Sequence, residues 1–183
     1  MLSTENDPRL TSLEPAIAIR DPLGLTPLPE DNRKRFLKFV LSQNLQALLP
    51  LTQVLEVMQL SSSDILPIPD MTDCIIGVCV WKGETLWVVD LNHLVGYESS
   101  YQRSQLVEIL NVIVIQDSYQ TLGLVVEQVS DIDLFDDEKI FKRAGLCSAG
   151  LEPFISGHLP RQNGVVLEAA SILNAPQLHA HGK

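Results

Sequence analysis

The chain has 183 residues, of which 45% are hydrophobic and 20% charged, and its formal net charge is -10 at pH 7. The length suits one ordinary domain or two small, closely packed halves. The acidic surplus argues against a DNA- or RNA-binding protein, because a surface that follows phosphates needs an excess of bases. The sequence shows neither a run of ~20 apolar residues, as in a membrane-spanning helix, nor a basic and apolar secretory signal. We therefore expect a cytoplasmic protein that does not insert into the membrane.

Proline distinguishes the first part of the chain from the rest. Five of the 11 prolines lie within residues 1–30. This composition, without apolar periodicity, is typical of a flexible arm. We predict a flexible proline-rich arm over residues 1–32, a folded region over residues 33–175 and a flexible tail over residues 176–183.

Two apolar runs open the folded region. Residues 36–41 and 45–49 are separated by a short polar stretch, which predicts a β-hairpin. Residues 51–58 follow Pro50, which stands where a first helical turn begins, and their apolar side chains have helical spacing. We predict one short helix here, although residues 54–57 are equally compatible with an extended segment.

Pairs of strands then recur along the chain. Residues 74–81 and 85–89 predict a hairpin closed by Lys82-Gly83, and residues 90–96 predict a short helix capped by Asp90. Similar strand pairs follow at residues 112–115 and 122–126, and at residues 154–157 and 165–167, where a short helix over residues 168–173 comes next. Short strands at this spacing are typical of small β-barrels.

Four segments, in order, resemble the signature of CheW-like coupling domains. They are residues 49–57 (LPLTQVLEV), residues 75–83 and 87–91 (IIGVCVWKG and WVVDL), residues 123–132 (GLVVEQVSDI) and residues 154–157 (FISG). The resemblance extends from about residue 35 to residue 173. It implies an all-β fold of two intertwined SH3-like five-stranded β-barrels with a few short helices, with no catalytic activity and no bound cofactor.

The resemblance also implies a function and partners. Proteins of this kind are non-catalytic adaptors that couple receptors to a CheA-type histidine kinase in a two-component pathway. The sequence departs from the family pattern at Ile76 and Trp87, so the resemblance does not identify the receptor. The candidates are a methyl-accepting chemoreceptor, a photoreceptor and a receptor of a pilus-motility system. Such an adaptor is expected at receptor arrays or at the inner face of the membrane. The alternative is a peptide- or small-molecule-binding β-barrel regulator without kinase coupling.

The candidate partner-binding residues follow from the matched positions. Glu56 is a lone acid among apolar residues and matches the acid of the family pattern, and Lys82 matches its arginine. Each is otherwise an ordinary solvated side chain. Val54, Trp81 and Trp87 are each either core residues or apolar contacts for a partner. The predicted partner-binding set is therefore Val54, Glu56, Lys82, Trp81 and Trp87.

Enzyme and metal motifs are not found in the sequence. It lacks a phosphate-binding loop and a nucleophile elbow. The three cysteines, Cys74, Cys79 and Cys147, lie in unrelated contexts and are expected to be buried thiols rather than disulfides. The acidic stretch over residues 131–138 has Asp136 and Lys142 where a calcium-binding EF-hand needs glycine and glutamate. We interpret this stretch as a solvated acidic loop and expect no catalytic, cofactor or metal site.

Overall fold

The computed structural model describes residues 33–41, 45–103, 108–136, 140–141, 147–159 and 164–179. The chain divides into two units, Met1–Asp31 and Asn32–Lys183, and all described residues belong to the second. The arm predicted over residues 1–32 and the last part of the predicted tail, residues 180–183, lie outside the described residues.

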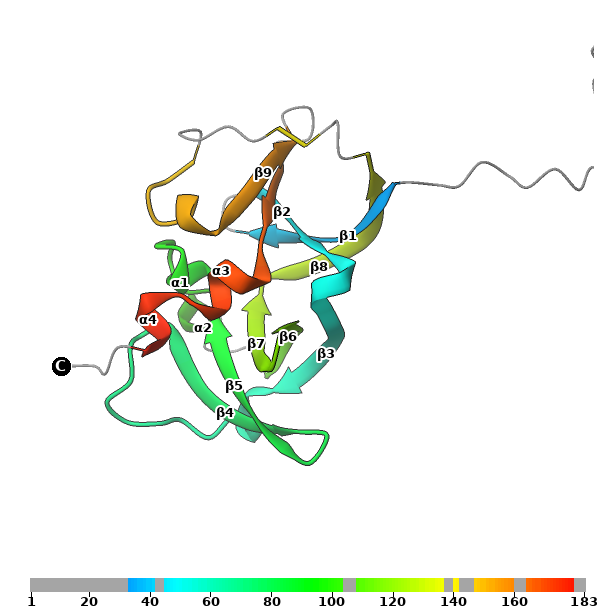
Figure 1. Cartoon of the computed structure of the whole chain (residues 1–183). Helices are drawn as coiled ribbons and strands as arrows, with labels where there is room; N and C mark the ends of the chain where they lie inside the picture. Colours follow the sequence, from blue (N-terminus) through cyan, green and yellow to red (C-terminus); the bar gives the residue numbers. More distant parts are fainter. Residues whose placement is uncertain are drawn as a thin grey trace, which may run out of the picture. The chain divides into compact units, whose positions relative to one another are not determined.

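The described strands form two five-stranded sheets (Figure 1). The first, barrel A, contains in spatial order β8 (Gln128–Phe135), β1 (Lys34–Leu41), β2 (Leu45–Pro50), β10 (Gly164–Leu167) and β9 (Ile155–Leu159). The second, barrel B, contains β3 (Val54–Ser61), β6 (Ile109–Asp117), β7 (Gln120–Val126), β5 (Glu84–Asp90) and β4 (Ile75–Trp81). The helices described are η1 (Leu51–Gln53), η2 (Ser62–Asp64), α1 (Leu91–Leu94), α2 (Ser100–Arg103), η4 (Glu152–Phe154), α3 (Ala169–Leu173) and α4 (Pro176–His179). The prediction of an all-β fold with a few short helices is confirmed.

The two barrels share one pattern of strand pairing. In the spatial order given above, neighbouring strands among the first three of each sheet are antiparallel. The fourth strand is parallel to the third, and the fifth is antiparallel to the fourth. The edge strands exchange between the barrels: β3 follows β2 of barrel A but pairs with β6, and β8 follows β7 of barrel B but pairs with β1. Figure 1 shows both strands crossing from one sheet to the other, so the barrels are intertwined.

Each sheet is closed by one short bridge. Leu66, which follows β3, exchanges backbone hydrogen bonds of 2.8 and 2.9 Å with Val78 on β4. In barrel A, Phe141 exchanges bonds of 3.0 and 2.9 Å with His158 on β9. The close approach at the first bridge requires Gly77, because a Cβ there would collide with the Leu66 carbonyl oxygen. The two bridges therefore curl each sheet into a barrel.

In the part of the chain that the structure describes, the buried apolar side chains form three cores. The smallest lies inside barrel A and consists of Phe36, Leu48, Phe135, Leu159 and Val166. A second lies inside barrel B and consists of Leu60, Ile65, Cys79, Leu86, Val88, Leu110, Val112, Val114 and Val125. The largest, the shared core, draws residues from both sheets and from α1 and α3, including Phe39, Leu49, Leu91, Ile113, Leu124 and Ile172. Most of the buried apolar surface therefore joins the barrels rather than filling either one.

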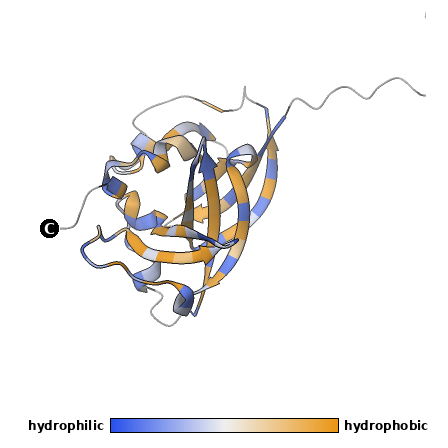
Figure 2. Ribbon diagram, turned by 60° about the horizontal axis from the view of Figure 1, so that its bottom comes forward, coloured by the Kyte–Doolittle hydropathy of each residue, from blue (hydrophilic) through white to orange (hydrophobic). Residues whose placement is uncertain are grey.

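Strand sequences reflect this arrangement. On β6, Val112 and Val114 face the interior of barrel B, whereas Ile113 and Ile115 face the shared core. A strand that is buried on both faces needs a continuous apolar run instead of a polar alternation. Figure 2 shows such runs along the central strands of the fold.

The predicted hairpins are confirmed, with local changes at their ends. In the segment at residues 51–58, the predicted helix is limited to η1 over residues 51–53, and residues 54–58 are extended in β3. The acidic-loop interpretation was wrong for Asp131 and Asp133, which lie on β8. In the predicted tail, residues 176–179 form α4. Cys74 and Cys79 are buried free thiols, and Cys147 is free and half-buried.

The helix after β5 forms where the sequence indicates, and one buried carboxylate holds its surroundings together. The backbone N–H of His93 donates to Oδ1 of Asp90, at 3.2 Å, which caps α1. Oδ2 of Asp90 accepts from the Ser99 hydroxyl at 2.7 Å and from the Tyr101 backbone N–H at 3.0 Å. Asp90 is 1% exposed, and these three donors satisfy its buried charge.

The shared core predicts that the barrels unfold together. Leu48→Ala removes an apolar side chain from the interior of barrel A, and we expect the free energy of unfolding to fall by ~2–5 kcal/mol. Both tryptophans lie in barrel B, so their fluorescence reports on that barrel. In urea we expect the fluorescence transition to shift together with the far-ultraviolet circular dichroism transition. A fluorescence midpoint unchanged by Leu48→Ala would contradict the shared core.

Candidate partner-binding site

Three of the five predicted site residues meet at one end of barrel B. Nζ of Lys82 lies 2.9 Å from Oε2 of Glu56, and the indole N–H of Trp81 donates to the same oxygen at 3.1 Å. The Lys82 ammonium also lies 4.4 Å from the centre of the Trp81 ring, a cation–π contact. The carboxylate, the ammonium and the indole therefore form one cluster, which we call the Glu56 cluster.

Barrel closure brings these residues together. Glu56 lies on β3 and Trp81 ends β4, and these strands are opposite edges of the same sheet. Lys82 and Gly83 form a two-residue turn between β4 and β5, with φ of 51° and 84°. Two positive φ values match a type I′ hairpin turn, which suits the right-handed twist of the strands and which glycine adopts without strain. The turn therefore projects Lys82 back toward β3.

The electrostatics of the cluster favour the charged form of Glu56. Hydrogen bonds from Lys82 and Trp81 hold the pKa of the Glu56 carboxyl below its ordinary value. The side chains of Lys82 and Glu56 remain 62% and 38% exposed. Because an exposed ion pair adds little to stability, the main effect of the contacts is to fix a charged group in one orientation at the surface.

The edge strand around Glu56 exposes apolar side chains. Leu55 is 45% exposed and Val57 is 44% exposed, and they flank Glu56 on β3. Sequence reasoning missed both. The signal that could have found them is the alternation that a strand imposes, because Glu56 and Met58 then share one face and Leu55 and Val57 the other.

The other two predicted residues do not join the Glu56 cluster. Val54 is half-buried and packs against the shared core. Trp81 packs against the core of barrel B, whereas Trp87 lies opposite Val78 on the outer face and is 38% exposed. The two tryptophans, each left open between core and contact surface, therefore have different environments.

Trp87 belongs to a row of apolar side chains across the outer face. Leu66 lies opposite Val78, which lies opposite Trp87, so the three share one face. Val80, two residues after Val78, is 80% exposed, and Leu66 is 67% exposed. We call Leu66, Val78, Val80 and Trp87 the outer row. Only Trp87 of the outer row was predicted.

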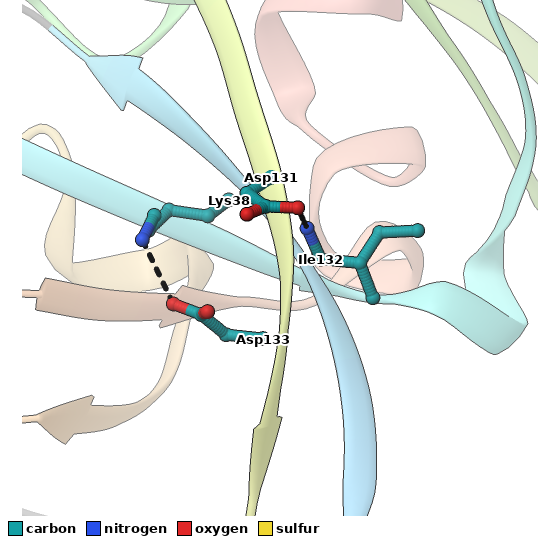
Figure 3. Close-up of polar contacts among 4 residues, drawn as sticks. All are labelled: Lys38, Asp131, Ile132 and Asp133. Atoms are coloured by element: carbon teal, nitrogen blue, oxygen red, sulfur yellow. Dashed lines mark hydrogen bonds and ion pairs between the residues drawn. The ribbon is translucent and has the colours of Figure 1, made fainter.

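Barrel A carries an ion pair of its own (Figure 3). Nζ of Lys38 on β1 lies 2.9 Å from Oδ2 of Asp133 on β8. Next to this pair, Oδ1 of Asp131 accepts from the Ile132 backbone N–H at 2.7 Å. The Lys38–Asp133 pair has the same separation as the Glu56–Lys82 pair but lies in the other barrel, so it provides a matched control for the loss of an ion pair.

The sequence and the fold match one family. A sequence model described as a CheW-like domain matches residues 35–181. The chain belongs to the CheW-like domain family. The fold is also similar to the crystal structure of the scaffolding protein TtCheW from Thermoanaerobacter tengcongensis, with a TM-score of 0.62 and 19% sequence identity, over 74% of this chain and 89% of that chain. A comparison with curated proteins gave no match.

These findings confirm the resemblance stated from the sequence motifs, and with it the fold of two SH3-like barrels. In the described part of this CheW-like chain, no group of three or more histidine, cysteine, aspartate or glutamate side chains is placed to hold a metal ion. None of the described helices has the length and apolar character needed to span a membrane.

The lowered pKa of Glu56 gives a pH prediction. Because the pKa is lowered in the folded chain, the ion pair stabilises the fold above the ordinary glutamate pKa, and this contribution is lost as the pH falls through the lowered pKa. Lys82→Asn removes the ammonium and leaves Asn-Gly, a favoured type I′ turn sequence. We expect the Glu56 titration midpoint, followed by carbon-13 NMR, to rise in this variant. Equal midpoints in both proteins would show that Lys82 does not hold the carboxylate.

Proposed function

We propose that this CheW-like chain is a non-catalytic signalling adaptor that couples a receptor to a CheA-type histidine kinase. The surface that binds the kinase is the edge of β3, with the Glu56 cluster on one face of the strand and Leu55 and Val57 on the other. The observation that carries the proposal is the fixed, charged Glu56 on an edge strand with exposed apolar side chains. We place the chain in the cytoplasm, at receptor arrays.

Two physical features support a binding surface at this position. An aromatic ring and a fixed ion pair beside exposed apolar residues combine the anchors that dominate interface energies with a charged group that sets orientation. Among the described strands, β3 pairs in the sheet with β6 alone, and its side chains Leu55 and Val57 are exposed beside this unpaired edge. The CheW-like family, and the description of TtCheW as a scaffolding protein, agree with an adaptor.

The net charge of -10 constrains the partner. A partner surface that is neutral or basic meets the chain without long-range repulsion. Salt screens the charges but leaves the apolar contacts with Leu55 and Val57 unchanged. Binding should therefore weaken at high ionic strength without disappearing.

Two substitutions test the proposed surface. Glu56→Gln and Lys82→Asn each remove one charge of the cluster, and we expect each to weaken binding to the regulatory domain of a CheA-type kinase about tenfold, or ~1.4 kcal/mol. Because both side chains are exposed, the free energy of unfolding should change by less than ~0.5 kcal/mol. Isothermal titration calorimetry and thermal melts on the same samples separate binding from folding.

Asp133→Asn is the matched control, since it breaks the Lys38–Asp133 ion pair of barrel A. It should leave the affinity for the same regulatory domain of the CheA-type kinase unchanged. If Asp133→Asn weakens binding as much as Glu56→Gln, or if neither cluster variant changes it, the kinase does not bind at the Glu56 cluster.

A further inference from the structure

A pocket of about 370 Å³ opens beside Trp87 on the outer face of barrel B. Apolar side chains from both sheet and helix form its walls: Met71, Ile75, Trp87, Val89, Leu122, Leu173 and Leu178. Its polar lining comes from Gln120, Thr121 and His179. An apolar pocket of this size with a few polar groups has the character of a binding site. Because Trp87 also belongs to the outer row, the pocket continues into an exposed apolar surface.

The C-terminal turn α4 forms one wall of this pocket. Leu178 is half-buried against the shared core, while the other three residues of α4 are exposed. The Thr72 hydroxyl donates to the Gln177 carbonyl oxygen at 2.8 Å, in an exposed position. By contrast, the neighbouring helix α3 buries Ile172 and Leu173. The contacts that hold α4 are therefore much weaker than those that hold α3.

Weak attachment gives α4 a low local stability. A segment with few buried apolar contacts and an exposed hydrogen bond opens at a smaller free energy than the whole fold. Opening α4 removes the partly buried Leu178 from the edge of the shared core, but it takes no strand from either sheet and no residue from the cores inside the two barrels. It would widen the pocket beside Trp87 and uncover the Leu173 side chain.

We propose that α4 is a displaceable cover of the Trp87 pocket, and that Leu178 occupies the place of an apolar side chain presented by a helix of a partner protein. Leu178 itself shows the chemistry that the pocket accepts, because it is an aliphatic side chain on a helical turn. Helices commonly bind grooves through such side chains. α4 and the partner helix compete for the same position, so the partner binds only those molecules in which α4 is displaced. This proposal does not depend on kinase binding at the Glu56 cluster.

Tryptophan quenching tests the cover. In a Trp81→Phe background, Trp87 is the single tryptophan of the chain, which has two. We expect Leu178→Ser and Thr72→Val to raise the acrylamide quenching constant of Trp87 about twofold or more, because each loosens α4. Gln177→Ala is the control, since it keeps the backbone carbonyl that accepts the bond from Thr72. Unchanged quenching in Leu178→Ser, or a loss of melting temperature as large as that of Leu173→Ser, would overturn the cover.

A peptide tests the proposed occupant. The probe is a net-neutral amphipathic helical peptide of leucine, alanine, glutamate and lysine, and its analogue with serine for leucine is the reference. We expect Thr72→Val to bind the leucine peptide more tightly than the parent chain does. Adding Trp87→Ala to Thr72→Val should remove that gain in affinity. Equal binding by the parent chain, Thr72→Val and the double variant, or equal binding of the two peptides, would overturn a helix-presented side chain as the occupant.

Discussion

Apolar packing between the two barrels is the constraint on which the rest of the fold depends. Among the described residues, the interior of barrel A contains five buried apolar side chains, far fewer than the shared core. A barrel with so small an interior gains little from closing alone. The crossing of β3 and β8 ties the two barrels together. Each of these edge strands completes the sheet of one barrel, while the strand before it in the chain belongs to the other barrel. The barrels are therefore two parts of one folding unit.

The surface chemistry of barrel B is a consequence of that architecture. The shared core fixes β6 and β5, closure at Leu66 and Val78 curls the sheet, and the curl brings the edge strand β3 beside the turn at Lys82. Glu56 is then oriented by two donors from the opposite edge. It adds little to the stability of the fold, since exposed ion pairs are screened by solvent. Its role in our account is to present one charge in a fixed orientation to a partner.

Much of the fold follows from the sequence, and the exceptions have physical causes. Turn residues such as Lys82-Gly83 marked the hairpins, and the family motifs located Glu56 and Lys82 without showing that they touch. The segment at residues 51–58 was ambiguous because an edge strand with apolar residues on both faces lacks a period-two pattern. Asp133 suggested a loop because its pairing with Lys38, 95 residues away, is not visible in local composition. The two-residue turn did contain the information that Trp81 and Trp87 face opposite ways, since it places Trp87 opposite Val78.

The proposed kinase surface is best tested by hydrogen exchange of the complex with a CheA-type regulatory domain, because backbone amides report where a partner excludes solvent. We expect binding to slow exchange over β3 and the turn at Lys82 and Gly83, and to leave β1 and β8 around Lys38 and Asp133 unchanged. If exchange slows along β8 while β3 exchanges as in the free chain, the kinase binds barrel A and the proposed surface is wrong.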